Sequence, residues 1–161
     1  MTKNEFAAED AREMARILRN AKCMQRYDKI SHDLLGEILV AAALNGFVEG
    51  GNRRGSDVRA PAYGRVEVKS RILGTDGPFP RVSLRPSNLE KADHFVALRW
   101  NRDFSFHDAV MNTKEAVMHL YRGKEQHSGM AHITWKDWCG AAGALSLRAE
   151  IIGLLNESAT A

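Results

Sequence analysis

The segment that most constrains the fold is the run Arg-Val-Glu-Val-Lys-Ser-Arg-Ile at residues 65–72, in which apolar and polar side chains alternate. Because successive side chains of a strand point to opposite faces of a sheet, this alternation predicts a β-strand. One face would be apolar and would carry Val66, Val68 and Ile72. The other face would carry the ionisable groups Glu67, Lys69 and Arg71. The sequence therefore predicts a strand that is buried on one face and equipped for chemistry on the other.

The elements expected around this strand indicate an α/β fold. Further strands are expected near residues 57–59, 81–85, 95–98 and 104–110, and helices at 5–21, 31–45, 87–91, 113–122, 136–142 and 146–156. A chain of 161 residues, of which 44% are hydrophobic, suits one compact domain. We therefore expect a single domain over residues 1–161, a mixed β-sheet flanked by helices. It would have an N-terminal helix at 5–21 and a helical C-terminal portion at 113–157.

The helix expected at residues 31–45 carries one isolated charge. Ser31 is expected to cap its N-terminus, and Gly46 to end it in a left-handed conformation. Glu37 is the only charged residue in the otherwise almost wholly apolar run 34–48. A buried carboxylate is costly unless it is paired or bound to a metal. Glu37 therefore either points at a metal site on the sheet, directly or through a water, or lies on an exposed stripe or pairs with an arginine.

Positive charge is concentrated in the middle of the chain. The whole chain has a formal net charge of +3. Residues 47–102 hold eleven Lys/Arg and six Asp/Glu, a net of +5, so the remaining twelve basic and fourteen acidic residues give −2. Arginine suits phosphate recognition because its planar fork supplies paired hydrogen bonds as well as charge. A basic surface that serves only solubility is the alternative interpretation.

Two acids and a lysine are spaced so that they could meet on neighbouring strands. Asp57 precedes Glu67 by ten residues, and Lys69 follows Glu67 by two. Mg²⁺ prefers oxygen ligands and usually retains water, so Asp57 and Glu67 could supply two ligands and the Val68 carbonyl a third. Lys69 shares a strand face with Glu67, where it could orient an attacking water and offset charge on a phosphate.

An acidic helix residue, an aspartate after a Gly-Ser turn and a Glu-x-Lys strand together resemble the PD-(D/E)XK nuclease superfamily, which includes type II restriction enzymes and Holliday junction resolvases. The resemblance covers about residues 31–72 and looks most like an archaeal-type Holliday junction resolvase. It implies a restriction-endonuclease-like mixed sheet. It also implies that the catalytic metal site comprises Glu37, Asp57, Glu67 and Lys69. Ser56 stands where the motif's name has proline, a common replacement.

The resemblance implies a Mg²⁺-dependent endonuclease, with Mn²⁺ able to substitute, that hydrolyses phosphodiester bonds of duplex or branched DNA. RNA remains a candidate substrate because the metal chemistry is the same. The resemblance places Arg53, Arg54 and Ser56 at the nucleic acid, and the local charge adds Arg71, Arg81 and Arg85. Two cuts are most simply made by two sites, so a homodimer is expected. Two other functions stay open: a non-catalytic nucleic-acid-binding module, and a nuclease subunit that needs a partner.

The remaining sequence signals narrow the class of protein. No stretch approaches the roughly 18 apolar residues of a membrane span, and the N-terminus lacks the apolar run of a secretory signal, so we expect a cytoplasmic protein without a membrane partner. Cys23 and Cys139 form no disulfide framework or zinc motif. Trp135 and Trp138 lie at helical spacing, which is typical of a core or subunit interface, although indoles can also stack on bases.

Overall fold

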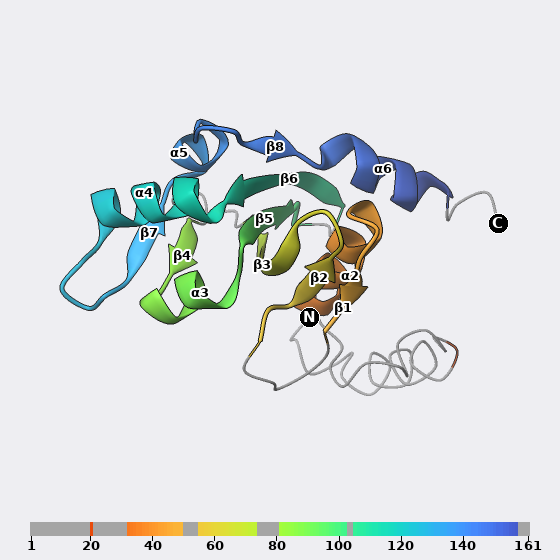
Figure 1. Cartoon of the computed structure of the whole chain (residues 1–161). Helices are drawn as coiled ribbons and strands as arrows, with labels where there is room; N and C mark the ends of the chain where they lie inside the picture. The colour runs from red at the N-terminus through yellow and green to blue at the C-terminus, as the bar shows by residue number, and fades with distance from the viewer. Residues whose placement is uncertain (1–19, 21–31, 50–54, 74–80, 103–104, 158–161) are drawn as a thin grey trace. The chain divides into compact units, whose positions relative to one another are not determined.

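The computed structural model describes residues 20, 32–49, 55–73, 81–102 and 105–157. Apart from Asn20, these residues belong to one compact unit, Ser31–Ala161. Its helices are α2 (His32–Ala43), α3 (Pro86–Lys91), α4 (Lys114–Lys124), α5 (Trp135–Cys139) and α6 (Arg148–Glu157) (Figure 1). Its strands are β1 (Phe47–Val48), β2 (Val58–Ala60), β3 (Gly64–Ile72), β4 (Val82–Leu84), β5 (His94–Trp100), β6 (Phe106–Thr113), β7 (Ala131–Ile133) and β8 (Leu145–Ser146). The helix expected at 5–21, apart from Asn20, and the cap Ser31 lie outside the described residues.

A six-stranded mixed sheet in the order β1-β2-β3-β5-β6-β8 forms the centre of this unit. Strands β3 and β5 run parallel, and the other neighbouring pairs are antiparallel. The chain between β3 and β5 contains β4 and α3, and β4 pairs with β7 in a separate antiparallel sheet. The predicted α/β class, a mixed sheet flanked by helices, is confirmed.

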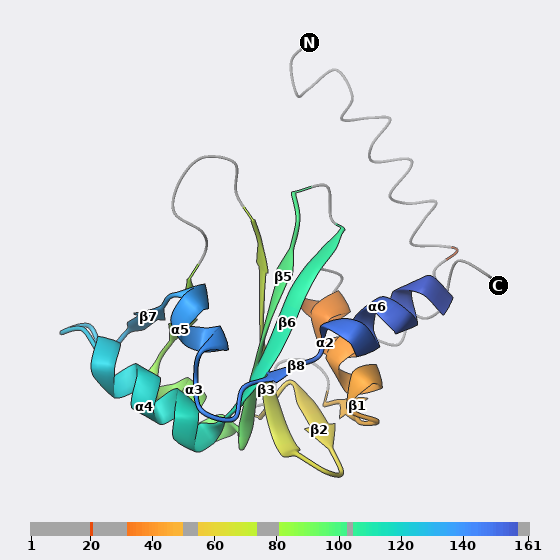
Figure 2. The same cartoon turned by 90° about the horizontal axis from the view of Figure 1, so that it is seen from above.

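Two hydrophobic clusters pack on opposite faces of the central sheet, and β5 contributes to both. Val96, Leu98 and Trp100 belong to the cluster that contains α2 and α6. Phe95 and Ala97 belong to the cluster that contains residues of α3, α4, α5 and both strands of the small sheet. Figure 2 shows α2 and α6 on one side of β3, β5 and β6, and α3, α4, α5 and β7 on the other. The apolar run 95–98 is thus the buried central strand that its composition predicts.

The end of α2 differs from the prediction in which residue turns left-handed. Asn45 adopts a positive φ of 53°, and asparagine is among the few non-glycine residues that tolerate this conformation. Gly46 instead follows with an ordinary φ, and its N–H donates to the carbonyl of Ala41 at 2.7 Å. A Cβ at this glycine would lie 2.3 Å from the backbone oxygen of Arg59. Gly46 is therefore required for the close approach of β1 to β2 rather than for the turn itself.

Helix α3 begins one residue earlier than the predicted range 87–91. Its first residue is Pro86, which fits the first helical turn because the N–H that proline lacks would have no partner within the helix. The N–H of the preceding Arg85 donates to the Asn88 side-chain oxygen at 2.9 Å. An asparagine inside the helix thus satisfies the backbone at its start, and leaves its amide group for a second contact.

The C-terminal elements follow the predicted ranges only in part. The helix expected at 136–142 is α5, which ends at Cys139, and the strands β7 and β8 interrupt the predicted helical portion 113–157. Helices α4 and α6 overlap the predicted helices 113–122 and 146–156. Trp138 is fully buried, and its indole N–H donates to the Val110 carbonyl at 3.0 Å, which confirms the core interpretation for this residue. Among the helices described, none has the length and apolar character needed to cross a membrane.

Candidate active site

The candidate site begins where β2 ends its pairing with β3. The ladder between these strands runs from Ala60↔Gly64 to Val58↔Val66. Asp57, which directly precedes β2, accepts the N–H of Val68 with its Oδ2 at 2.8 Å. The Asp57 side chain thus bonds to the backbone of β3 at Val68, two residues beyond Val66, the last residue of β3 that pairs with β2. This contact holds the Asp57 carboxylate at the edge of β3, as the spacing of ten residues predicts for adjacent strands.

Glu67 and Lys69 lie together on one face of β3, as the alternation predicts. The Lys69 ammonium donates to Glu67 Oε1 at 2.7 Å, and the Glu67 side chain is almost wholly buried. A second donor to the same oxygen is the Asn88 amide of α3, at 3.1 Å. The other oxygen, Oε2, is buried and has no hydrogen-bond partner among the described residues. Burying an acceptor without a partner costs roughly 1–3 kcal/mol, and more for a charged group. A hydrogen-bond donor or a cation placed beside Glu67 Oε2 would therefore stabilise the folded protein.

Burial and neighbouring acids raise the pKa of Asp57 from its ordinary value of 3.8 to about 6. Desolvation is the largest cause, followed by repulsion from Glu67 and, more weakly, from Glu37. The hydrogen bond from Val68 N–H and the charge of Lys69 act in the opposite direction. Glu37, Glu67 and Lys69 therefore all influence the pKa of Asp57, but from two sides. Glu67 and Lys69 share the face of β3 that is opposite α2, whereas Glu37 lies on α2.

Glu37 lies on α2, which packs closely against β3. A Cβ on the adjacent Gly36 would lie 3.4 Å from the Cβ of Ser70, so this glycine allows the helix to approach the strand. Glu37 is only 7% exposed. The interpretation that places it on an exposed stripe is therefore wrong, and the carboxylate lies inside the unit on the helix that covers β3.

These carboxylates do not yet form a metal cage. Within the described ranges, no group of three or more His, Cys, Asp or Glu side chains has the arrangement needed to hold an ion. The Glu67–Lys69 ion pair explains part of this, because it directs Glu67 Oε1 toward an ammonium group. The donor set is nevertheless what a hard cation prefers, namely carboxylate oxygens with a backbone carbonyl nearby. The orphaned Glu67 Oε2 is the atom that such a cation would satisfy first.

The predicted nucleic-acid contacts fall in three different settings. Arg53 and Arg54 lie outside the described residues. Ser56 is 6% exposed, and its hydroxyl donates to Glu49 at 2.5 Å, a placement that differs from the predicted contact with the DNA backbone. The pKa of Glu49 is lowered most by this hydrogen bond from Ser56 and next by the hydrogen bond from Arg59. The remaining three arginines are exposed: Arg71 near the end of β3, Arg81 directly before β4, and Arg85 directly before α3.

Three residues near the site were not predicted from the sequence. Asn88 contacts Glu67, and nothing in its sequence setting distinguishes it from any asparagine in a helical turn. Arg99 and Trp135 are in contact: the guanidinium carbon of Arg99 lies 4.2 Å from the centroid of the Trp135 indole. A signal for Arg99 does exist in the sequence, because it is the one charged residue inside the apolar strand 95–100.

Comparisons with known proteins do not place this chain in a family: no protein-family model matches it, and no curated protein has a matching sequence.

Proposed function

We propose that this protein is a divalent-metal-dependent endonuclease that hydrolyses phosphodiester bonds of DNA, with Mg²⁺ as its metal. The observation that carries the proposal is the convergence of Asp57, Glu67 and Lys69 at one edge of β3. Val68 N–H holds Asp57 at 2.8 Å, Lys69 lies 2.7 Å from Glu67, and the second Glu67 oxygen is buried without a donor in the described part of the chain. A site that served only as a structural ion pair would not need the additional acid Asp57.

The residues that would hold the metal are Asp57, Glu67 and the Val68 carbonyl, with Glu37 acting directly or through a water. The N–H and C=O of one strand residue point to the same side of the strand. Since Val68 N–H points to Asp57, the Val68 carbonyl faces the same edge of β3. The bound ion would stabilise negative charge on the phosphate and favour ionisation of a bound water.

The side chains then have distinct tasks in hydrolysis. Water attacks phosphorus in line with the leaving oxygen, a P–O ester bond breaks, and the products are one phosphomonoester end and one hydroxyl end. Lys69 orients the attacking water and offsets charge on the phosphoryl oxygens once its ammonium is released from Glu67. Asn88 keeps Glu67 in place through its amide. The burial of Glu67 removes competing bulk water and strengthens these interactions.

The test is a cleavage assay with plasmid, branched, single-stranded DNA and RNA in Mg²⁺ or Mn²⁺. We expect cleavage by the wild type and its loss in Asp57→Ala and in Lys69→Ala, while Arg122→Gln on α4 serves as a control for loss of a surface charge. If both site variants cleave as well as the wild type, the proposal is refuted.

A second measurement separates the alternatives. Binding of Mn²⁺ followed by electron paramagnetic resonance should be saturable in the wild type and weakened in Asp57→Ala. DNA binding that is salt-dependent, indifferent to metal and unaccompanied by cleavage would favour a non-catalytic binding module. Cleavage that appears only on addition of a second protein would favour a partner-dependent subunit.

A further inference from the structure

A small basic pocket lies beside the carboxylates, on the face of β3 opposite α2. It is walled by β3, β4, β5 and α5, and it shares Lys69 with the candidate active site. Its lining residues carry four cationic side chains and, as far as the described residues go, no acidic one. These cations are Lys69, Arg71, Arg81 and Arg99. Such a concentration of positive charge in a narrow recess is the arrangement that binds an anion.

Arg99 gives this pocket its most specific group. It is 5% exposed although it belongs to the central strand β5. Burial lowers its pKa, and the negative charge of Asp108, its neighbour across the β5–β6 ladder, opposes that effect. Its guanidinium stacks on Trp135 at 4.2 Å, a contact that fixes the plane of the fork. A buried arginine that is held flat against an indole fixes a positive charge in the wall of the pocket.

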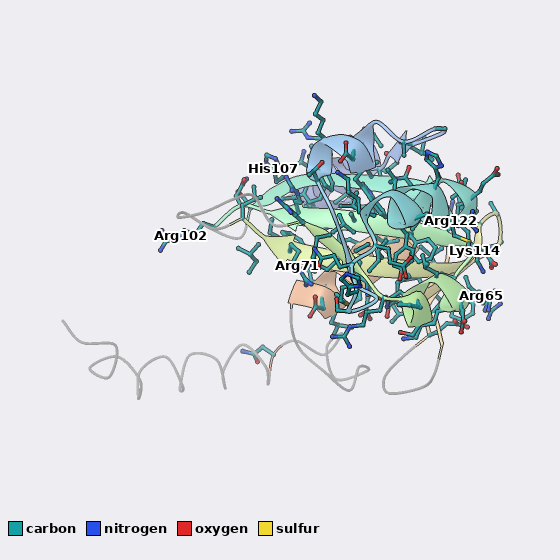
Figure 3. The ribbon with its side chains drawn as sticks, turned by 90° about the vertical axis from the view of Figure 1, so that its left-hand side faces the viewer. Arg65, Arg71, Arg102, His107, Lys114 and Arg122 are labelled. Carbon is teal, nitrogen blue, oxygen red and sulfur yellow. The ribbon has the colours of Figure 1, made fainter. Side chains whose placement is uncertain are left out.

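The other walls complete a setting for a tetrahedral oxyanion. Arg71 follows Lys69 by two residues on the same face of β3, a distance of about 7 Å along a strand. Figure 3 shows Arg71 at the end of the strand opposite Arg65. Arg81 precedes β4 and is exposed, so it lies at the rim of the pocket. The Ser83 hydroxyl, also in the lining, is hydrogen-bonded to His132 Nδ1 at 2.9 Å.

The recess has a cavity volume of about 10 Å³, which is the space of a single water molecule, so a larger anion would lie at its mouth. We propose that the mouth of this pocket binds a phosphate group of a nucleic-acid strand, next to the phosphate that would lie at the carboxylates. Arginine forks match phosphate oxygens in pairs, and a site with four cations and no acid among its described lining residues favours a ligand of high negative charge. The nucleic-acid source of the phosphate rests on the proposed function, whereas the phosphate chemistry of the pocket does not. The phosphate is either a terminal monoester or an internal diester, and the two are distinguished by experiment.

The first experiment uses inorganic phosphate and needs no cleavage. Each indole N–H gives a separate signal in a ¹H–¹⁵N spectrum, and Trp135 is in contact with Arg99. We expect the Trp135 signal to shift saturably as phosphate is added at constant ionic strength. The indoles of Trp100 and Trp138 are buried and donate to Ser70 and Val110, so they serve as internal references that should shift less.

Variants test whether the response comes from the pocket. Arg71→Gln and Arg81→Gln change exposed side chains, so the fold should persist, and each should weaken phosphate binding by roughly fivefold. Arg99→Gln should weaken it by roughly ten- to a hundredfold. If Arg99→Gln does not fold, the two exposed variants still decide the question. Arg122→Gln, which alters an arginine of α4 apart from Arg71 (Figure 3), should bind phosphate as the wild type does.

A second experiment identifies the source of the phosphate. Fluorescence anisotropy in EDTA would compare a labelled single-stranded oligonucleotide with a 5′-phosphate, a matched 5′-hydroxyl oligonucleotide, and the same pair with a 3′-phosphate. Tighter binding of one phosphorylated end, lost in Arg81→Gln, assigns the pocket to a terminal monoester. Equal binding of all forms, weakened equally by Arg81→Gln with a salt slope reduced by about 0.7, assigns it to an internal diester.

The proposal is overturned if Trp135 shows no saturable shift with phosphate. It is also overturned if Arg81→Gln leaves both phosphate and oligonucleotide binding unchanged. Because these experiments omit metal, their failure does not bear on cleavage. Conversely, a protein that binds phosphate here but never cleaves nucleic acid would retain the pocket and lose the nuclease proposal.

Discussion

Replacing Asp57 by asparagine should stabilise the metal-free protein, because the carboxylate is held in a setting that disfavours its charge. Desolvation, together with repulsion from Glu67 and Glu37, raises the pKa of Asp57 from 3.8 to about 6. The difference between these pKa values corresponds to about 3 kcal/mol of destabilisation when the group is fully ionised. Asparagine keeps a side-chain oxygen that can accept the N–H of Val68, which Asp57 now accepts at 2.8 Å.

The sign of the pH dependence follows from the two pKa values. In the unfolded chain Asp57 ionises near its ordinary pKa of 3.8, whereas in the folded protein it ionises near a pKa of 6. The destabilisation is therefore absent below about pH 4, grows between about pH 4 and 6, and is complete above. Urea unfolding in EDTA, followed by circular dichroism, should show Asp57→Asn more stable than the wild type by up to about 3 kcal/mol at pH 7.5. At pH 4 the two proteins should be similar.

Asp93 provides a control, because its substitution by asparagine should change the stability of the protein in the opposite direction. Hydrogen bonds from the side chain and N–H of Arg65 lower the pKa of Asp93 to about 2. Asp93→Asn should therefore destabilise the protein by a constant amount between about pH 5 and 7.5. Since the side chain is 46% exposed, solvent screening should keep this loss below about 1 kcal/mol.

The same urea unfolding measurement, repeated with Mg²⁺ in place of EDTA, tests whether the metal binds at Asp57. A ligand that binds only the folded state stabilises it, so the wild type should gain stability with Mg²⁺ and Asp57→Asn should gain much less. The reasoning is refuted if Asp57→Asn is less stable than the wild type at pH 7.5 in EDTA. It is equally refuted if its advantage is the same at pH 4.

Three further predictions concern single side chains. Lys69→Ala should lower the single-turnover cleavage rate by roughly 10²- to 10⁴-fold. It should also lower the unfolding midpoint at neutral pH, because it removes the cation that is paired with the buried Glu67 carboxylate. Asn88→Ala removes a donor to the strand glutamate and the internal cap of α3; Mn²⁺ affinity measured by calorimetry should fall by roughly 10- to 100-fold, and the exposed neighbour Ser87→Ala should not change it. Gly46→Ala places a Cβ 2.3 Å from a backbone oxygen of β2, so its melting temperature should fall. Gly123→Ala in α4, whose Cβ would meet nothing within 4 Å, should instead raise it.

The sequence by itself determined the parts of this protein that depend on local periodicity. The alternation at 65–72 identified β3 and placed Glu67 and Lys69 on one face, because a strand repeats every two residues. The apolar run containing Glu37 identified α2 and marked the glutamate as exceptional, because a lone charge in such a run needs compensation. The spacing between Asp57 and Glu67 was enough to put them on neighbouring strands, because a short turn joins antiparallel strands.

Only the tertiary structure decided which distant residues complete the site. Asn88 reaches Glu67 because the crossover between the parallel strands β3 and β5 lays α3 against β3. Arg99 and Trp135 come from a strand and a helix 36 residues apart in the sequence, and they meet because α5 packs on the face of β5 that Arg99 shares. The left-handed residue at the end of α2 is Asn45 rather than Gly46, and Gly46 is instead needed where the chain passes close to β2. This close approach likewise depends on the tertiary packing. Local patterns record which face of an element is buried, whereas the partner that covers that face is set by packing between elements, which no local pattern encodes.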